Sequence, residues 1–63
     1  MIKSKALHLR KGDIVTVRIG KEKAKVISKP ILDSSRTYAI VKIKVLSPFY
    51  KDEYNTVTQE DII

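Results

Sequence analysis

Apolar and polar residues alternate one by one along several stretches of this chain, and this pattern most constrains its fold. The clearest case is residues 37–46, in which Val41, Ile43 and Val45 are separated by lysines. Side chains of a strand point alternately to its two faces, so a period of two predicts a strand with one apolar face. The sequence has no convincing helical period, and we therefore predict an all-β chain.

Turn signals divide the chain into five short extended pieces. We predict a lead-in piece at residues 7–9 and strands at residues 13–19, 23–28, 37–46 and 54–58. Gly12 and Gly20 lie in the expected turns at residues 11–13 and 20–22, because glycine tolerates tight backbone conformations. Pro30 ends the second strand, since proline cannot donate to a central ladder.

The apolar side chains of these strands are predicted to face one core. The inward set is Val15, Val17, Ile19, Ala24, Val26, Val41, Ile43, Val45 and Val57. Ile31 and Leu32, within a loop at residues 29–37, are expected to fold back over this core. The Thr-Gln-Glu-Asp sequence of residues 58–61 has the form of a helix start, which predicts one short turn before Ile62 or Ile63 closes the end of the core.

Chain length limits the architecture to one thin-cored domain. A chain of 63 residues and 7.2 kDa buries about 60% of its surface on folding, which leaves no room for a deep internal site. Five short strands in such a length are typical of a small closed or half-closed barrel. We predict a single domain over residues 1–63, a five-stranded barrel with one short 3-10 turn before its last strand.

The order of these features resembles a known family. In SH3-like barrels of the KOW type, a Gly-Asp pair precedes a valine-rich strand, and a hairpin rich in glycine and lysine leads to a second strand. This chain is similar over residues 9–17 (LRKGDIVTV) and 20–27 (GKEKAKVI). Its close at residues 57–62 (VTQEDI) is similar to the end of many small SH3-like proteins. The resemblance implies an SH3-like barrel.

Charge is distributed unevenly along the chain. Thirteen Lys and Arg against seven Asp and Glu give a net charge of +6. Residues 1–51 contain all thirteen bases and three acids, which makes +10, whereas residues 52–63 contain four acids and no base, which makes −4. A basic body favours a polyanionic partner. Lysine-rich surfaces also keep small proteins soluble, so charge alone does not decide between the two interpretations.

Lysines recur at every second position in two predicted strands, at Lys23 and Lys25 and at Lys42 and Lys44. If these strands pair, four ammonium groups come close together, and their repulsion costs stability unless phosphates neutralise them. The alternative is a purely structural role, in which outward lysines protect strand edges from aggregation. The full set of predicted nucleic-acid-binding residues is Arg18, Lys21, Lys23, Lys25, Tyr38, Lys42 and Lys44.

Side-chain types around these lysines indicate weak sequence specificity. Lysines outnumber arginines ten to three, and arginine is the usual bidentate reader of guanine. Tyr38 is placed to stack on a base, as aromatic residues do in single-strand binders. We predict a small basic cytoplasmic protein that binds DNA or RNA through phosphate contacts, as a monomer or weak homo-oligomer.

A protein-interaction module is the alternative function. Such a module, or an inhibitor of the kind encoded by phages and mobile elements, would dock on an acidic partner. The loops at residues 29–37 and 48–54 would supply its surface, with the apolar residues Ile31, Leu32, Phe49 and Tyr50. Exposed apolar residues there would favour a partner protein.

Other classes of function lack the residues they need. The chain has no cysteine and one histidine, His8, which excludes disulfide frameworks and thiolate zinc sites. His8 has no nucleophile or carboxylate at a recognisable spacing, and the lone glycines Gly12 and Gly20 do not form a phosphate loop. No apolar run approaches a membrane span of ~20 residues, and we expect no signal peptide, enzyme activity, cofactor or metal.

Overall fold

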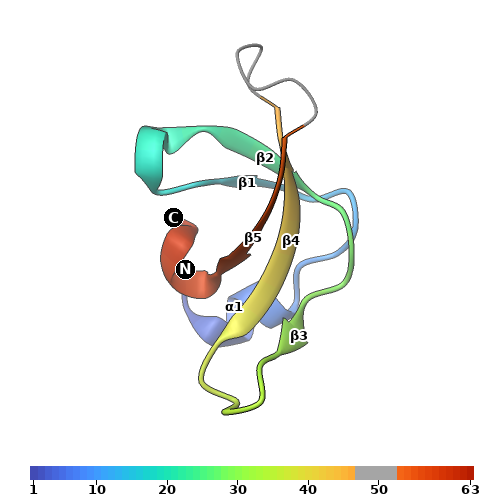
Figure 1. Ribbon diagram of the computed structural model, residues 1–63, viewed down its shortest axis with the longest axis vertical. Helices are drawn as coiled ribbons and strands as arrows, with labels where there is room; N and C mark the ends of the chain where they lie inside the picture. The colour runs from blue at the N-terminus through green and yellow to red at the C-terminus, as the bar shows by residue number, and fades with distance from the viewer. Residues whose placement is uncertain (47–52) are drawn as a thin grey trace.

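The computed structural model describes residues 1–46 and 53–63, and its centre is a five-stranded antiparallel sheet (Figure 1). Its elements in chain order are α1 (Lys3–Leu7), β1 (Ile14–Thr16), η1 (Ile19–Lys21), β2 (Lys23–Val26), β3 (Ile31–Leu32), β4 (Ala39–Val45), β5 (Tyr54–Thr58) and η2 (Gln59–Asp61). Strand β4 is the longest and pairs with β2 and β3 along one edge and with β5 along the other. Strand β1 pairs with β2. The two lysine-bearing strands, β2 and β4, therefore pair, which is the condition under which their four lysines come close together.

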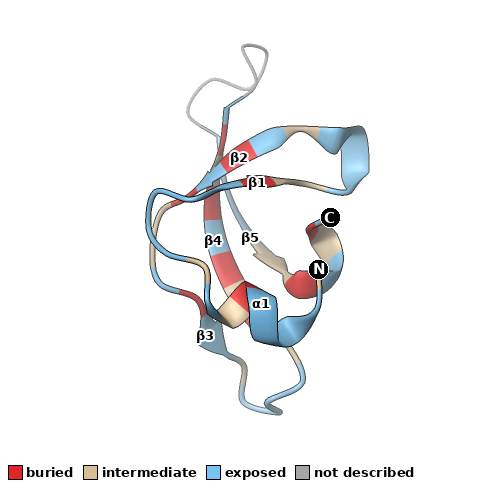
Figure 2. Cartoon of the chain, turned by 180° about the vertical axis from the view of Figure 1, so that it is seen from behind, coloured by how far each residue is buried: buried red, intermediate tan, exposed pale blue. Residues whose placement is uncertain are grey.

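The core lies on one face of this sheet, as the alternation predicts. Burial alternates strictly along β2 and at every second residue along β4 (Figure 2). The core cluster of buried residues is Ala6, Val15, Ala24, Val26, Ala39, Val41, Ile43 and Ile62. Val17 and Val57 are partly buried against it. A shift of β4 by one residue along its partners would move each of its side chains to the other face of the sheet. The buried set therefore fixes the register of β4.

Tight turns bound the β1–β2 hairpin at both ends, as predicted. Gly12 has a φ of +100° and Gly20 a φ of +76°, backbone conformations that favour glycine. The Asp13 carboxylate accepts a hydrogen bond from the Arg10 backbone N–H at 2.8 Å, which closes the first turn. Arg18 already has a right-handed helical conformation, so the chain leaves β1 before residue 19. Ile19 is consequently 81% exposed, and its predicted inward position is wrong.

A short helix replaces the predicted lead-in strand at residues 7–9. Helix α1 spans Lys3–Leu7, and its Ala6 is fully buried in the core. Five residues complete barely more than one turn, so no apolar period of 3.6 is visible in the sequence. Such a short helix depends on tertiary contacts rather than on propensity. The terminal ammonium of Met1 supplies one, because it donates hydrogen bonds to the carbonyls of Gln59 and Ile62.

Ile31 and Leu32 form strand β3, which corrects the prediction that they fold over the core. Their register partners on β4 are Ile40 and Ala39. Backbone pairing holds the two residues at the sheet, while their side chains remain 61% and 41% exposed. The fifth strand of the sheet is therefore β3, whereas the sequence assigned the fifth extended piece to residues 7–9.

The C-terminal segment turns back to β1, as the predicted short turn requires. The Asp61 carboxylate accepts hydrogen bonds from the Thr58 backbone N–H at 3.0 Å and from its hydroxyl at 3.3 Å. Ile62 follows turn η2 and lies fully buried in the core, where it forms a β-bridge with Val17. In the part of the chain that the structure describes, no helix is long and apolar enough to cross a membrane.

Candidate nucleic-acid interface

Four lysines gather on the face of the sheet opposite the core. Lys25 on β2 and Lys44 on β4 are direct register partners, so their Cβ atoms lie roughly 4.5–5.5 Å apart. Lys23 and Lys42 lie two residues from them along the same strands and on the same face. We call these four residues the lysine face.

Strands β1 and β5 extend the lysine face on both sides. Ile14 is the register partner of Lys25 on β1, and Tyr54 is the partner of Lys44 on β5. The four residues form one row across the sheet, with Ile14 55% and Tyr54 59% exposed. The Lys44 ammonium lies 5.8 Å from the centroid of the Tyr54 ring, within reach of a cation–π interaction. An exposed aromatic ring thus stands beside the lysines.

Threonines lie beside two of the lysines of the lysine face, Lys23 and Lys42. Lys23 donates a hydrogen bond from Nζ to Thr16 Oγ1 at 2.7 Å, and Lys42 faces Thr56 across the β4–β5 pair. Lys25 and Lys42 have no hydrogen bond or ion pair from their side chains within residues 1–46 and 53–63. The ammonium groups of Lys25 and Lys42 are therefore available to an external anion.

The other three predicted site residues lie outside the lysine face. Arg18 donates from Nε to the Glu60 carbonyl at 2.9 Å, which places it beside η2. Lys21 is exposed in η1 and has a positive φ of 50°. Tyr38 is half-buried just before β4, and its backbone N–H donates to Asp33 Oδ1 at 3.2 Å. The structure brings together the four lysines and leaves these three outside that cluster.

Tyr54 is the aromatic residue that sequence reasoning missed. The sequence analysis assigns the stacking role to Tyr38 instead. The signal was present: Val57 points inward, so strand alternation places Tyr54 and Thr56 on the outward face. The predicted aromatic loop residues Phe49 and Tyr50 lie outside the described residues.

Asp33 organises the loop that leads from β3 to β4. Its carboxylate accepts hydrogen bonds from the Ser35 hydroxyl at 2.8 Å and from the backbone N–H of Thr37 at 3.0 Å. Desolvation alone would raise the pKa of Asp33, but the hydrogen bonds from Ser35, Tyr38 and Thr37 outweigh it and lower the pKa. The carboxylate is thus held in its charged form.

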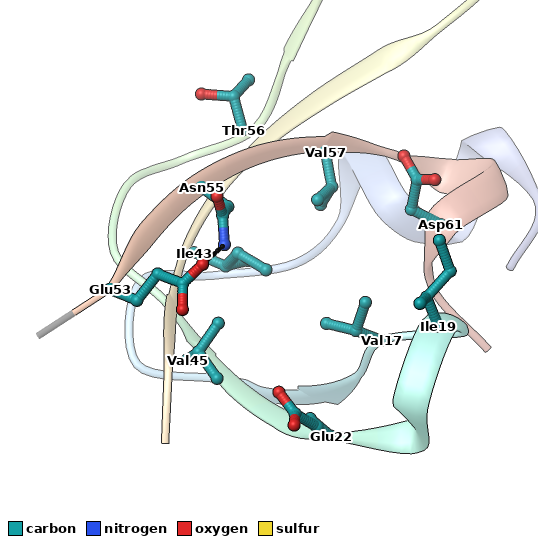
Figure 3. Close-up of a pocket in the computed structure, with 10 residues that line it drawn as sticks. All are labelled: Val17, Ile19, Glu22, Ile43, Val45, Glu53, Asn55, Thr56, Val57 and Asp61. Atoms are coloured by element: carbon teal, nitrogen blue, oxygen red, sulfur yellow. Dashed lines mark hydrogen bonds between the residues drawn. The ribbon is translucent and has the colours of Figure 1, made fainter. Parts of the chain in front are cut away.

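An acidic groove occupies the core side of the sheet, between β5 and the β1–β2 hairpin (Figure 3). Its volume is about 430 Å³, and valines and Ile43 form its apolar floor. Glu22, Glu53 and Asp61 stand along its margin. Glu53 accepts a hydrogen bond from Asn55 Nδ2 at 3.3 Å. The groove carries the charge opposite to that of the lysine face and is unsuited to phosphates.

Within residues 1–46 and 53–63, no group of three or more His, Asp or Glu side chains is arranged to hold a metal ion. Comparisons of the chain with protein-family models, with curated proteins and with solved structures find no significant match.

Proposed function

We propose that this chain is a small binding protein that holds nucleic acid on its lysine face, by phosphate contacts of low sequence specificity. The observation that carries the proposal is the direct pairing of Lys25 with Lys44. Like charges placed opposite each other on a sheet destabilise it. A polyanion removes that repulsion, and each neutralised phosphate releases counterions that add to affinity.

Tyr54 supports a second contribution to binding. Its ring is exposed beside Lys44, where a base that has left its stack would meet an aromatic face. Stacking on aromatic side chains contributes about 1–3 kcal/mol per base and tolerates any sequence. Single-stranded nucleic acid is therefore the form that the lysine face and Tyr54 together suit best. Such a role fits a cytoplasmic protein.

We further propose that the sheet closes as an SH3-like barrel of the kind that residues 9–27 resemble. The sheet order runs from β1 through β2 and β4 to β5, and the chain then returns to β1 through the bridge of Ile62 with Val17. This return supports closure. The lysine face would then lie on the outside of the barrel, on its most regular strands.

Fluorescence anisotropy of labelled oligonucleotides tests the functional proposal. Single- and double-stranded DNA and RNA are titrated with the protein at low and high salt. The double variant Lys25→Gln/Lys42→Gln removes two charges from the lysine face, and Lys3→Gln/Lys5→Gln removes two from exposed positions on α1. We expect tightest binding to single strands, weaker binding at high salt, and a loss of affinity in the first variant only. No binding of any oligonucleotide at low salt would overturn the proposal.

A docking surface for an acidic protein is the second candidate. The exposed apolar side chains of Ile31 and Leu32 favour it, because exposed apolar surface marks sites of contact with partner proteins. In that case the same anisotropy titrations remain flat, and Ile31→Ser weakens the capture of an acidic partner, whereas Lys5→Gln leaves it unchanged.

A further inference from the structure

A second basic site lies apart from the lysine face, where the chain leaves α1. A hollow of about 650 Å³ is lined there by Leu7, His8, Leu9, Arg10, Lys11 and Lys29. We call it the basic hollow. Its volume falls within the range of about 300–1,000 Å³ that is typical of small-molecule sites. None of its residues belongs to the lysine face.

Backbone hydrogen bonds hold the walls of the basic hollow in place. The Leu9 N–H donates to the Ala6 carbonyl at 3.2 Å, and the Gly12 N–H donates to the Val26 carbonyl at 2.7 Å. The turn at residues 10–13 is fixed by the hydrogen bond of Asp13 to the Arg10 backbone described above. One wall is therefore tied to the end of α1 and the other to the end of β2, which leads to Lys29.

Cations without partners line the basic hollow. The side chains of Arg10, Lys11 and Lys29 are exposed, and in the described parts of the chain they make no hydrogen bond or ion pair. No carboxylate is among the lining residues. Several positive charges around one concave surface concentrate the field there and attract an anion. Arginine in particular matches the geometry of a phosphate group with two parallel hydrogen bonds.

The remaining lining residues favour more than a bare phosphate. Leu7 and Leu9 are half-buried and packed against the core, so they offer a fixed apolar wall. His8 Nδ1 lies 2.6 Å from the Ser4 carbonyl, which can only accept, so Nδ1 carries a proton, and Nε2 is an acceptor whenever the ring is neutral. An apolar wall, a hydrogen-bond acceptor and three cations match the base, the sugar hydroxyls and the phosphate of a nucleotide.

We propose that the basic hollow binds one nucleotide, with its phosphate on Arg10 and Lys29 and its base against Leu7 and Leu9. The ligand is either a free nucleotide or a nucleotide unit of a strand, because both present the same chemistry. This site goes beyond the lysine face and does not depend on it.

Titration by nuclear magnetic resonance tests the proposal directly. The methyl signals of Leu7 and Leu9 are followed while adenosine monophosphate, adenosine or inorganic phosphate is added to the full chain. We expect saturable shifts with adenosine monophosphate and weaker binding of the other two. Arg10→Gln/Lys29→Gln should raise the apparent Kd for adenosine monophosphate roughly tenfold, since hydrogen bonds to charged groups are lost. The control Lys3→Gln/Lys5→Gln, with the same change in charge, should leave it unaltered.

Two results would overturn the assignment: no saturable shift of Leu7 and Leu9, or equal binding of inorganic phosphate and adenosine monophosphate. Oligonucleotide anisotropy with the Arg10→Gln/Lys29→Gln variant separates the sources. A loss of strand binding identifies a unit of a strand as the ligand, and unchanged strand binding identifies a free nucleotide. If no oligonucleotide binds but adenosine monophosphate does, the lysine-face proposal fails while the basic hollow stands.

Discussion

Neighbouring residues on β4 have opposite roles, and Lys42 and Ile43 show this most clearly. Ile43 is 1% exposed in the core, whereas Lys42 is exposed on the opposite face. A domain of this length has roughly 3–9 kcal/mol of stability, at about 0.05–0.15 kcal/mol per residue. A single buried side chain is therefore a large part of what keeps the chain folded.

We predict that Ile43→Ala lowers the free energy of unfolding by about 2–5 kcal/mol, because it leaves a cavity in the core. Lys42→Ala should change it by no more than about 0.5 kcal/mol, since the side chain is on the surface. Urea denaturation monitored by circular dichroism measures both. A larger effect at Lys42 than at Ile43 would mean that the register of β4 is shifted by one residue.

Asp33 gives the chain part of its acid sensitivity. Its pKa is lowered in the folded state by the hydrogen bonds of its loop, so the charged carboxylate stabilises the fold above its ordinary pKa of about 3.9. This stabilisation is lost as the pH falls through the lower, folded-state pKa. We predict that Asp33→Asn reduces the loss of stability between neutral pH and pH about 3, measured by urea denaturation across that range. Parallel pH profiles of the two proteins would contradict this role.

At the scale of residues, strand alternation predicts the buried and exposed sets of β2 and β4. It fails at Ile19, because a change of backbone conformation at Arg18 ends the strand and no apolar pattern records it. Tyr54 was missed for a different reason. Its outward position follows from the inward position of Val57, but the stacking role was given to Tyr38.

The buried polar side chain of Gln59 connects η2 to the start of β4. It is 8% exposed, and its amide accepts a hydrogen bond from the Ala39 N–H at 2.7 Å and donates to the Thr37 carbonyl at 3.2 Å. Through these bonds η2 satisfies backbone groups at the start of β4. Sequence reasoning used Gln59 only as part of a helix-start pattern.

We predict that Gln59→Ala lowers the free energy of unfolding by about 1–3 kcal/mol, because a buried backbone N–H loses its acceptor. Glu60→Ala, one residue away and exposed, is the matched control and should have little effect. Thermal unfolding monitored by circular dichroism compares the two. Equal midpoints for both variants would show that the Gln59 bonds do not couple η2 to β4.

The type of an element could be predicted from the sequence where the element is long enough for its apolar pattern to repeat. Strand β4 has seven residues and β5 has five, and both were found with nearly correct bounds. Helix α1 and strand β3 have five and two residues, too few for any period to appear. Both depend on tertiary contacts, α1 on the burial of Ala6 and β3 on its pairing with β4.

The whole molecule depends on the return of the C-terminal segment to β1. The Arg18 N–H donates to the Asp61 carbonyl at 2.7 Å, and the Ile63 N–H donates to the Thr16 carbonyl at 2.9 Å. We predict that amide hydrogen exchange at Arg18 and Ile63 is slowed to a degree comparable with that of β4. These amides exchange only when the C-terminal segment separates from β1. Exchange as fast as at the exposed Ser34 would contradict the proposed closure of the sheet into a barrel.

Charge is also organised at this scale. The lysine face and the acidic groove lie on opposite sides of the sheet, although the sequence shows only a basic body with an acidic end. The separation follows from β-strand alternation on β2 and β4, and it could be predicted for the lysines. The acidic groove could not be, because Glu22 and Asp61 are brought together by the return of the chain to β1.

The salt dependence of oligonucleotide binding tests the central claim most directly. For single strands, the slope of log K against log salt is about −0.7 for each neutralised phosphate. Lys25→Gln/Lys42→Gln should therefore reduce its magnitude by about 1.4, the product of two contacts and that factor, whereas Lys3→Gln/Lys5→Gln should leave the slope unchanged. The same slope in wild type and in Lys25→Gln/Lys42→Gln, or an equal reduction in both variants, would contradict phosphate binding by the lysine face.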